Sequence, residues 1–263
     1  MRLLYIGDIM AQAGITVVSE VLPELKQTHQ PDIVVAQAEN VTNGKSMSLD
    51  DMHMLQSIGI DFFTGGNHTP VNSELHDALA DANQPVVGPA NMPSCPGDGY
   101  KFLQSKLGKV LFISLLGQTV GKEVLIENPL LVIDEILEKT AADQPIAIIV
   151  NFHGDFSSEK RIIGYYLDGR ASLVVGDHWH VPTADAMVLE KGTAHITDVG
   201  MCGSLHSSLG VTLDSVVPRW RDGKITKNLL AGERPYQFNA VLVDIDHSTG
   251  LANSIEQTQI IKQ

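Results

Sequence analysis

The sequence predicts an α/β fold, and three observations support it. Short apolar runs alternate with amphipathic helical stretches over the first 85 residues, a pattern typical of strands and helices that form separate layers. Hydrophobic residues make up 43% of the 263-residue chain, which is enough for a substantial buried core. No internal repeat, low-complexity tract or linker divides the chain, so we expect a single domain over residues 1–263.

The elements of the first third follow from the spacing of apolar residues. Apolar residues three and four positions apart predict helices, whereas continuous apolar runs predict strands that are buried on both faces. Ser48 precedes one of these helices and is a suitable N-cap, because its hydroxyl can accept a backbone N–H of the first turn. The expected strands are residues 2–6, 32–38 and 61–64, and the expected helices are residues 15–28, 48–57 and 73–81.

The rest of the chain is richer in strands. Residues 85–99 are dense in proline and glycine, so we expect a loop there. After this loop, two apolar runs flank Leu107-Gly108 and are typical of a hairpin. The expected strands are residues 100–105, 109–116, 146–152, 171–175, 186–189, 194–198, 225–230 and 238–245, and the expected helix is residues 129–141.

Charge and hydropathy exclude several classes of partner. The net charge of −13 at pH 7 argues against binding of long nucleic acid, which needs a basic surface. A small phosphorylated substrate remains compatible with this charge, because bound metal ions supply local positive charge. No stretch of the sequence approaches the ~20 apolar residues that span a bilayer, so we expect no membrane partner.

The cysteines and the N-terminus indicate the compartment. Cys95 and Cys202 are the two cysteines, and they form neither a metal-binding pair nor a disulfide framework. The apolar run before Asp8 is too short for a secretory signal. We therefore expect a cytoplasmic protein. Composition leaves open whether copies of the chain assemble into a homo-oligomer.

Polar side chains follow five of the predicted strands, at the point where each strand ends. Because the carboxyl ends of strands in an open α/β sheet converge beyond the hydrogen-bonded ladder, we expect these side chains to form one ligand site. Each residue alone has a simpler interpretation as a turn, a cap or a structural histidine, but their joint occurrence favours a site. The residues are Asp8, Glu39, Asn40, Asn67, His68, His153, His178 and His180.

The mixture of side chains indicates the kind of ion that such a site would bind. Imidazole together with carboxylate and amide oxygen suits Mn, Fe or Zn, whereas oxygen ligands alone would indicate Mg or Ca. One ion needs about four to six ligands, so this many candidates predicts two ions that share a bridging carboxylate. We expect two divalent or mixed-valence metal ions, with Fe or Mn favoured and Zn as the alternative. Two such ions are the usual apparatus for displacement at phosphorus.

The order of these motifs resembles that of the calcineurin-like metallophosphoesterases. More narrowly, it resembles their bacterial YmdB-type branch, described as 2′,3′-cyclic-nucleotide phosphodiesterases. The resemblance runs through nearly the whole chain. The segments that carry it are Gly7-Asp8, Glu39-Asn40, Gly66-Asn67-His68, Phe152-His153, Ser158-Glu159-Lys160 and residues 164–170, 176–180, 181–185 and 196–201.

The resemblance implies a fold and a set of ligands. The implied fold is a metallophosphoesterase-like α/β/β/α sandwich, with two central mixed sheets and helices on the outside. The implied centre holds two metal ions that share Glu39: the first is also bound by Asp8, Asn40 and His180, and the second by Asn67, His153 and His178.

The resemblance also implies the reaction, which is hydrolysis of small phosphodiesters with 2′,3′-cyclic nucleotides as the expected substrates. Our hypothesis is that a hydroxide bridging the two metals attacks phosphorus while His68 protonates the leaving oxygen as general acid. The alternative is a non-catalytic metal-binding regulatory or scaffold protein on the same fold, in which His68 would have no task. A metal-dependent amidohydrolase would place a His-x-His pair early in the chain, whereas the pair at 178 and 180 comes late.

Some segments depart from the family pattern or lie outside the expected site. Trp179 separates the paired histidines where threonine is commoner, and we expect it to affect the mouth of the pocket. Asp155 follows Gly154 where a glutamate is expected. Lys160-Arg161 is expected on a solvated helix, and residues 201–204 are expected to form a loop near the site.

Overall fold

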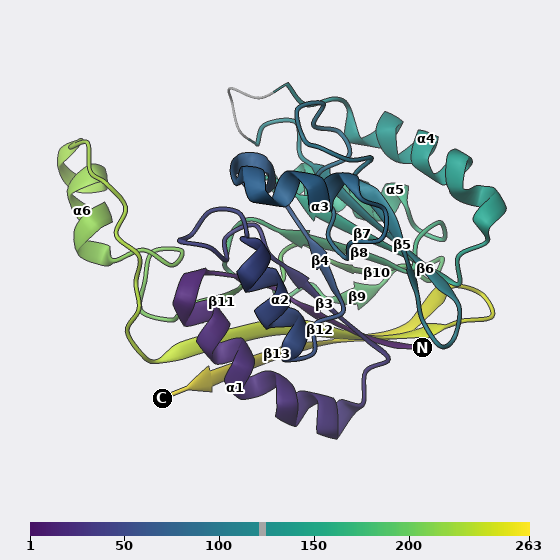
Figure 1. Ribbon diagram of the computed structural model, residues 1–263, viewed down its shortest axis with the longest axis horizontal. Helices are drawn as coiled ribbons and strands as arrows, with labels where there is room; N and C mark the ends of the chain where they lie inside the picture. Colours follow the sequence, from purple (N-terminus) through teal and green to yellow (C-terminus); the bar gives the residue numbers. More distant parts are fainter. Residues whose placement is uncertain (121–124) are drawn as a thin grey trace.

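The structure is a computed structural model that describes residues 1–120 and 125–263 (Figure 1). Within these residues the strands form one seven-stranded and one six-stranded sheet. The two sheets pack face to face, and helices cover their outer faces. Both sheets mix parallel and antiparallel pairs, so the predicted α/β/β/α sandwich is confirmed. The single domain over residues 1–263 stays a prediction.

The strands of the first sheet are, in order across it, β2 (Asp8–Ile9), β11 (Met201–Ser204), β12 (Tyr236–Asp246), β1 (Arg2–Ile6), β3 (Ile33–Gln37) and β4 (Phe62–Thr64), with β13 (Leu251–Lys262) paired to β12. β1, β3 and β4 run parallel to one another. β12 runs antiparallel to β1 and forms a long hairpin with β13. The carboxyl ends of β1, β3 and β4 therefore meet at one edge of the sheet.

The strands of the second sheet are, in order, β5 (Tyr100–Gln104), β6 (Lys109–Leu116), β7 (Ala147–His153), β8 (Leu173–Asp177), β10 (Ala194–Ile196) and β9 (Met187–Val188). The predicted hairpin is β5–β6, which pairs antiparallel. β6, β7, β8 and β10 are parallel. In this register His153 at the end of β7 pairs with Asp177 at the end of β8, which sets two polar side chains next to each other.

The helices are α1 (Ala11–His29), α2 (Leu49–Ser57), α3 (His76–Ala80), α4 (Pro129–Thr140), α5 (Ser157–Tyr166) and α6 (Leu213–Asp222). The predicted cap of α2 is confirmed, because the Ser48 side chain accepts the backbone N–H of Asp51. α1 and α2 cover the first sheet and α4 and α5 the second, while α6 projects from the body (Figure 1). Within the described residues, no helix combines the length and the apolar character needed to cross a membrane.

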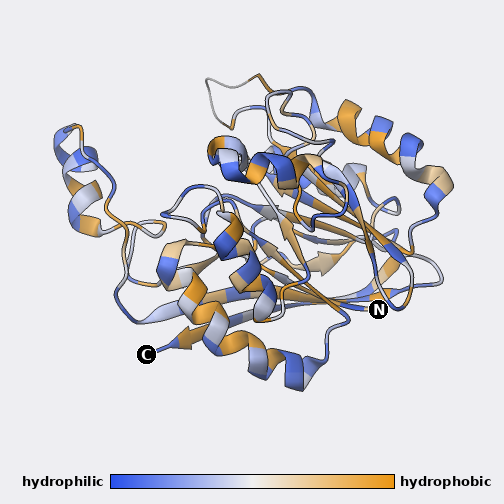
Figure 2. Ribbon diagram, viewed as in Figure 1, coloured by the Kyte–Doolittle hydropathy of each residue, from blue (hydrophilic) through white to orange (hydrophobic). Residues whose placement is uncertain are grey.

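The core explains why the strands are nearly continuous apolar runs. In β1, Leu3 and Tyr5 pack in the layer between the two sheets, whereas Leu4 and Ile6 pack beneath the helices of the first sheet. Successive strand residues point to opposite faces, so a strand covered on both sides must be apolar at every position. The same hydrophobic strands are visible in both sheets in Figure 2.

The prediction of a strand at residues 225–230 is wrong. This stretch runs as an irregular segment beside α6, and Ile225 is fully exposed. Arg219 on α6 donates hydrogen bonds to the side chains of Thr226 and Asn228 at 3.0 and 2.8 Å. The first part of the segment is therefore held by a guanidinium group, and its end by a backbone hydrogen bond from Thr212 to Leu229 and an isolated bridge between Val211 and Leu230. Alternation of apolar residues does not distinguish these contacts from a strand ladder.

Two further expectations need correction. The predicted loop at residues 201–204 is β11, which pairs parallel with β2 and antiparallel with β12. The predicted helix at residues 73–81 is divided into a short 3₁₀ helix, Ser73–Leu75, and α3. Both segments are short, so partners distant in the sequence determine their conformation more than their own residues do. α6 and β13 were not anticipated.

Gly7 lies at the junction between β1 and the polar residues that follow it. A Cβ at this position would overlap the carbonyl oxygen of Gly200 and would lie 3.3 Å from that of Asn239. Backbone atoms cannot rotate away, so we expect Gly7→Ala to lower the free energy of unfolding by about 1–3 kcal/mol. Urea unfolding followed by circular dichroism measures this change.

Gly232→Ala is the matched control, because an added Cβ there meets none of the described residues within 4 Å. We expect this control to change stability by less than about 0.5 kcal/mol. Equal stability of the two variants would contradict the close packing of Gly7.

Candidate metal centre

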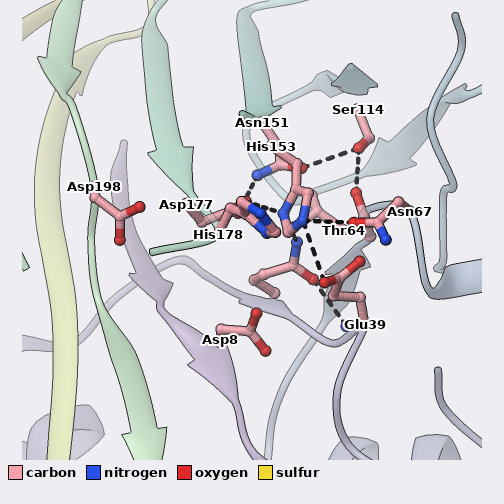
Figure 3. Close-up of polar contacts among 12 residues, drawn as sticks. Asp8, Glu39, Thr64, Asn67, Ser114, Asn151, His153, Asp177, His178 and Asp198 are labelled. Atoms are coloured by element: carbon pink, nitrogen blue, oxygen red, sulfur yellow. Dashed lines mark hydrogen bonds and ion pairs between the residues drawn. The ribbon is translucent and has the colours of Figure 1, made fainter. Parts of the chain in front are cut away.

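Side chains from the carboxyl ends of strands in both sheets gather at one place (Figure 3). The structure brings all eight predicted site residues together, because each lies within hydrogen-bond or ring-contact distance of another. They form two groups that meet at Glu39. The roles assigned to the individual residues stay predictions.

The first group contains Asp8, Asn40 and His180. The Asp8 Oδ2 atom lies 2.8 Å from Asn40 Nδ2 and 3.1 Å from His180 Nε2. The other ring nitrogen of His180, Nδ1, lies 3.1 Å from the carbonyl oxygen of Leu209. Because a carbonyl can only accept, Nδ1 carries the proton, and Nε2 is left to bind a cation.

The second group contains Glu39, Asn67, His153 and His178. His153 Nε2 lies 3.2 Å from Glu39 Oε1 and 3.1 Å from Asn67 Oδ1. The rings of His153 and His178 meet edge to face, with centroids 4.3 Å apart. One donor atom each from Glu39, His153 and His178 lies within 4.8 Å of the others. These three side chains have the spacing of ligands to a single ion.

Glu39 joins the two groups. Its Oε1 atom lies 3.3 Å from Asn40 Nδ2 in the first group and 3.2 Å from His153 Nε2 in the second. Its Oε2 atom accepts the backbone N–H of His68 at 2.9 Å. A Cβ at Gly66 would overlap Glu39 Oε2 and crowd the ring of His153, so the close approach here requires glycine.

Two residues on the side of His153 away from the centre were not among the predicted site residues. Asp177 Oδ1 lies 2.6 Å from His153 Nδ1, and this carboxylate fixes the ring so that Nε2 faces the centre. Asn151 donates to Asp177 and accepts from Ser114 at 2.9 Å. The available signals were the position of Asp177 at the end of a strand and the presence of a polar Asn151 within an apolar run.

The centre contains buried carboxylates whose negative charge a bound cation would balance. Asp8 and Glu39 are buried, and in the described part of the chain only histidines form ion pairs with them. Burial raises the pKa of Asp8 despite the opposing effect of His180. Burial also acts to raise the pKa of Glu39, but His153 outweighs it and holds the pKa well below its usual range. Burial lowers the pKa of His178 to about 4. Burial acts in the same direction on His153 and His180, but Glu39 and Asp177 raise the pKa of His153 and Asp8 raises that of His180. Without a metal ion these two rings therefore carry the positive charge that a bound cation would supply.

One carboxylate oxygen of Asp8 indicates whether these residues fit a metal ion. Asp8 Oδ1 is buried and has no hydrogen-bond partner among the described residues, a situation that native proteins rarely tolerate without an ion or water. Near this oxygen, Asn40 Nδ2 lies within hydrogen-bond distance of three acceptor atoms, one each from Asp8, Glu39 and His180. A cation could occupy the position at which these atoms meet. As a metal ligand, Asn40 would turn its amide oxygen towards this position, and a 180° rotation of the side-chain amide brings the oxygen there. The residues therefore fit a cation.

A cavity of about 750 Å³ opens beside the centre, a volume typical of small-molecule sites. His68 lines it, with its side chain 32% exposed and Nδ1 3.0 Å from Asn40 Oδ1. α6 contributes Arg219 and Trp220 to the lining, which the sequence interpretation did not foresee. The lining residues in the described part of the chain do not include Trp179, so its expected effect on the pocket mouth is not supported.

The sequence profile described as "YmdB-like protein" matches residues 4–258. The chain belongs to the YmdB-like family. Two relatives support this assignment. A Bacillus subtilis (strain 168) protein named 2′,3′-cyclic-nucleotide 2′-phosphodiesterase is 36% identical over 261 residues, covering 99% of this chain and 97% of the relative. A Mycoplasma pneumoniae protein named putative phosphatase/phosphodiesterase is 30% identical, covering 99% and 93%.

Solved structures agree with the YmdB-like assignment. A hypothetical protein from Thermus thermophilus has a TM-score of 0.90 at 32% identity, with 100% of both chains covered. A Mycoplasma pneumoniae phosphatase has a TM-score of 0.92 at 29% identity, covering 99% of this chain and 93% of that one. A 5′-nucleotidase precursor from Thermus thermophilus shares the fold alone, with a TM-score of 0.55 at 11% identity over 100% of this chain and 54% of that one. The predicted family is confirmed, and the names of the relatives agree with the predicted class of enzyme, a phosphoric-diester hydrolase.

Proposed function

We propose that this YmdB-like protein is a binuclear-metal phosphodiesterase that hydrolyses 2′,3′-cyclic nucleotides. The observation that carries the proposal is the position of Glu39, whose carboxylate lies between two groups of ligands. A carboxylate shared by two ions is the arrangement expected of a two-metal hydrolase. The name of the Bacillus subtilis relative supports the choice of substrate.

The residues that would hold the metals divide as the geometry does. When bound, the two ions would make a nucleophile available from water at neutral pH and would neutralise charge on the phosphoryl oxygens. Imidazole and oxygen donors together suit Fe or Mn, with Zn as the alternative. The first ion would be held by Asp8, Asn40, His180 and Glu39, and the second by Glu39, Asn67, His153 and His178.

His68 is the proposed general acid. It lines the cavity next to the ligands, and its backbone N–H is anchored to Glu39 Oε2 at 2.9 Å. Its Nδ1 atom lies 3.0 Å from the side-chain amide of Asn40, so Nε2 is the ring nitrogen that is available to a substrate. A proton held at Nε2 can pass to the leaving oxygen, a contribution that typically accelerates hydrolysis by about 10²–10⁴-fold.

The cavity supports a small anionic substrate. Lys45, Arg219 and Lys227 line it, although the chain as a whole carries a net charge of −13. Local cations of this kind attract a phosphodiester that the rest of the surface would repel. Both cysteines are free, which supports the reducing, cytoplasmic setting that we propose for this activity.

A turnover assay tests the proposal. Purified protein is stripped with a chelator, reloaded separately with Mn²⁺, Fe²⁺ or Zn²⁺, and incubated with 2′,3′-cyclic AMP. We expect ring opening to a nucleoside monophosphate, measured by chromatography, only in the reloaded samples. Stoichiometric metal binding without turnover of any phosphodiester would instead favour the non-catalytic regulatory or scaffold protein.

A further inference from the structure

Lys160 occupies an unexpected environment. The sequence predicted a solvated lysine, but the Lys160 side chain on α5 is completely buried. Its Nζ atom lies 2.6 Å from Asp198 Oδ2 and 4.0 Å from the centroid of the Trp179 ring. A buried ion pair is often no more stabilising than a well-packed apolar pair. The pair therefore calls for an explanation other than stability of the core.

Asp198 connects two loops that lead into the metal centre. Its Oδ2 atom accepts the backbone N–H of Trp179 at 2.9 Å, and Trp179 lies between the two histidines of the centre. Its Oδ1 atom accepts the backbone N–H of Gly200 at 2.9 Å. The carbonyl oxygen of Gly200 in turn accepts the backbone N–H of Asp8 at 3.0 Å. One carboxylate thus holds the backbone next to three of the proposed ligands.

The turn that Asp198 holds has an unfavourable backbone conformation. His178 and His180 have backbone φ angles of 102° and 61°, values that residues other than glycine rarely adopt. Such residues persist only when surrounding contacts hold them. Two of these contacts come from Trp179: its backbone N–H bonds to Asp198, and its Nε1 bonds to the carbonyl oxygen of Asp155 at 2.9 Å. The histidines add two more, from His178 Nε2 to Asp155 Oδ1 at 2.9 Å and from His180 Nδ1 to the carbonyl oxygen of Leu209 at 3.1 Å.

We infer that Lys160 and Asp198 form a positioning pair that presets the metal centre, by holding the histidine turn and the loop before Gly200. Lys160 supplies the counter-charge for a carboxylate that accepts one backbone N–H at each oxygen. It also packs against the Trp179 ring, which limits movement of the turn. The inference rests on the proposed metal-binding role of His178, His180 and Asp8.

Two substitutions separate this role from a general structural one. Asp198→Asn leaves one acceptor oxygen for two N–H groups, because its amide nitrogen can only donate. Lys160→Met keeps the length of the side chain and removes its charge. Arg161→Met is the matched control, because Arg161 is the next residue of α5 and pairs with Asp185 at 2.9 Å, at a partly exposed position.

The measurement is Mn²⁺ affinity of the metal-free full chain by isothermal titration calorimetry, together with thermal unfolding of the metal-free protein. Loss of a partner behind a ligand typically costs about 10–100-fold in metal affinity. We expect this loss in Asp198→Asn and Lys160→Met, and a change of less than about threefold in Arg161→Met, since it leaves that partner in place.

Each other outcome overturns the inference. Wild-type affinity in folded Asp198→Asn and Lys160→Met would overturn the positioning role while leaving the metal centre intact. Failure of both variants to fold, or an equal loss of affinity in Arg161→Met, would assign the pair to general stability. A wild-type chain that binds no Mn²⁺, Fe²⁺ or Zn²⁺ would overturn the proposed function, and this inference with it.

Discussion

Replacement of Glu39 by glutamine is expected to abolish turnover and to remove at least one of the two metal ions. The Glu39 carboxylate faces both groups of ligands, at 3.3 Å from Asn40 Nδ2 and 3.2 Å from His153 Nε2. Glutamine keeps the shape but loses the charge, and it turns an amide donor towards one of the two groups. We expect the loss in kcat/KM to exceed the roughly 10–100-fold that loss of an outer partner typically costs.

Metal content by mass spectrometry and kcat/KM for 2′,3′-cyclic AMP measure this effect. Glu74→Gln is a suitable control, because Glu74 is exposed in the short 3₁₀ helix Ser73–Leu75, which follows His68 in the chain. It should keep both metal content and activity. Two ions per chain together with normal turnover in Glu39→Gln would refute the bridging assignment.

Replacement of His68 by alanine is expected to lower kcat by about 10²–10⁴-fold on a substrate with an alkoxide leaving group. Metal content should stay near that of the wild type, because His68 contacts the proposed ligands Asn40 and Glu39 without being one. A phosphodiester that releases p-nitrophenolate needs little protonation, so its turnover should fall much less. The comparison of the two substrates in steady-state assays isolates the loss of a proton donor.

His76→Ala is the matched control for His68→Ala. His76 lies a short distance beyond His68 in the chain, and its Nε2 atom lies 2.8 Å from the carbonyl oxygen of Pro70. Among the described residues, no hydrogen bond or ion pair joins it to a residue of the centre. It should leave both substrates unaffected. Complete loss of metal from His68→Ala, or an equal fall with both leaving groups, would be inconsistent with a general acid.

The elements that sequence predicted well are the buried strands. β1, β3 and β7 are apolar at nearly every position because each is covered on both faces, and this requirement is visible in the chain itself. The polar residues that end these strands were identified for the same reason. Asp8, Glu39 and His153 interrupt or follow runs that are otherwise apolar, so their positions stand out without any knowledge of the tertiary structure.

The segments that sequence predicted badly depend on distant partners. β11 is a strand because β2 and β12 flank it. The segment after α6 is irregular, and its contacts are with Arg219 and with residues 211–215. Lys160 was expected in solvent because the spacing along α5 does not reveal that Asp198 lies opposite. In each case the deciding interaction joins residues that local patterns cannot relate.

The layered α/β fold and the eight residues that gather at the strand ends could be inferred from the chain alone, because burial and ligand chemistry restrict the residue types at individual positions. The family was inferred from the resemblance of the motifs. The resemblance had also implied the division of the ligands into two groups around Glu39, but the ring nitrogen of His180 that faces inward became visible only in three dimensions. The contacts of Asp198 with two loops emerged in the same way. These properties depend on distances between residues of the two sheets that are far apart in the sequence, and local sequence patterns do not contain such distances.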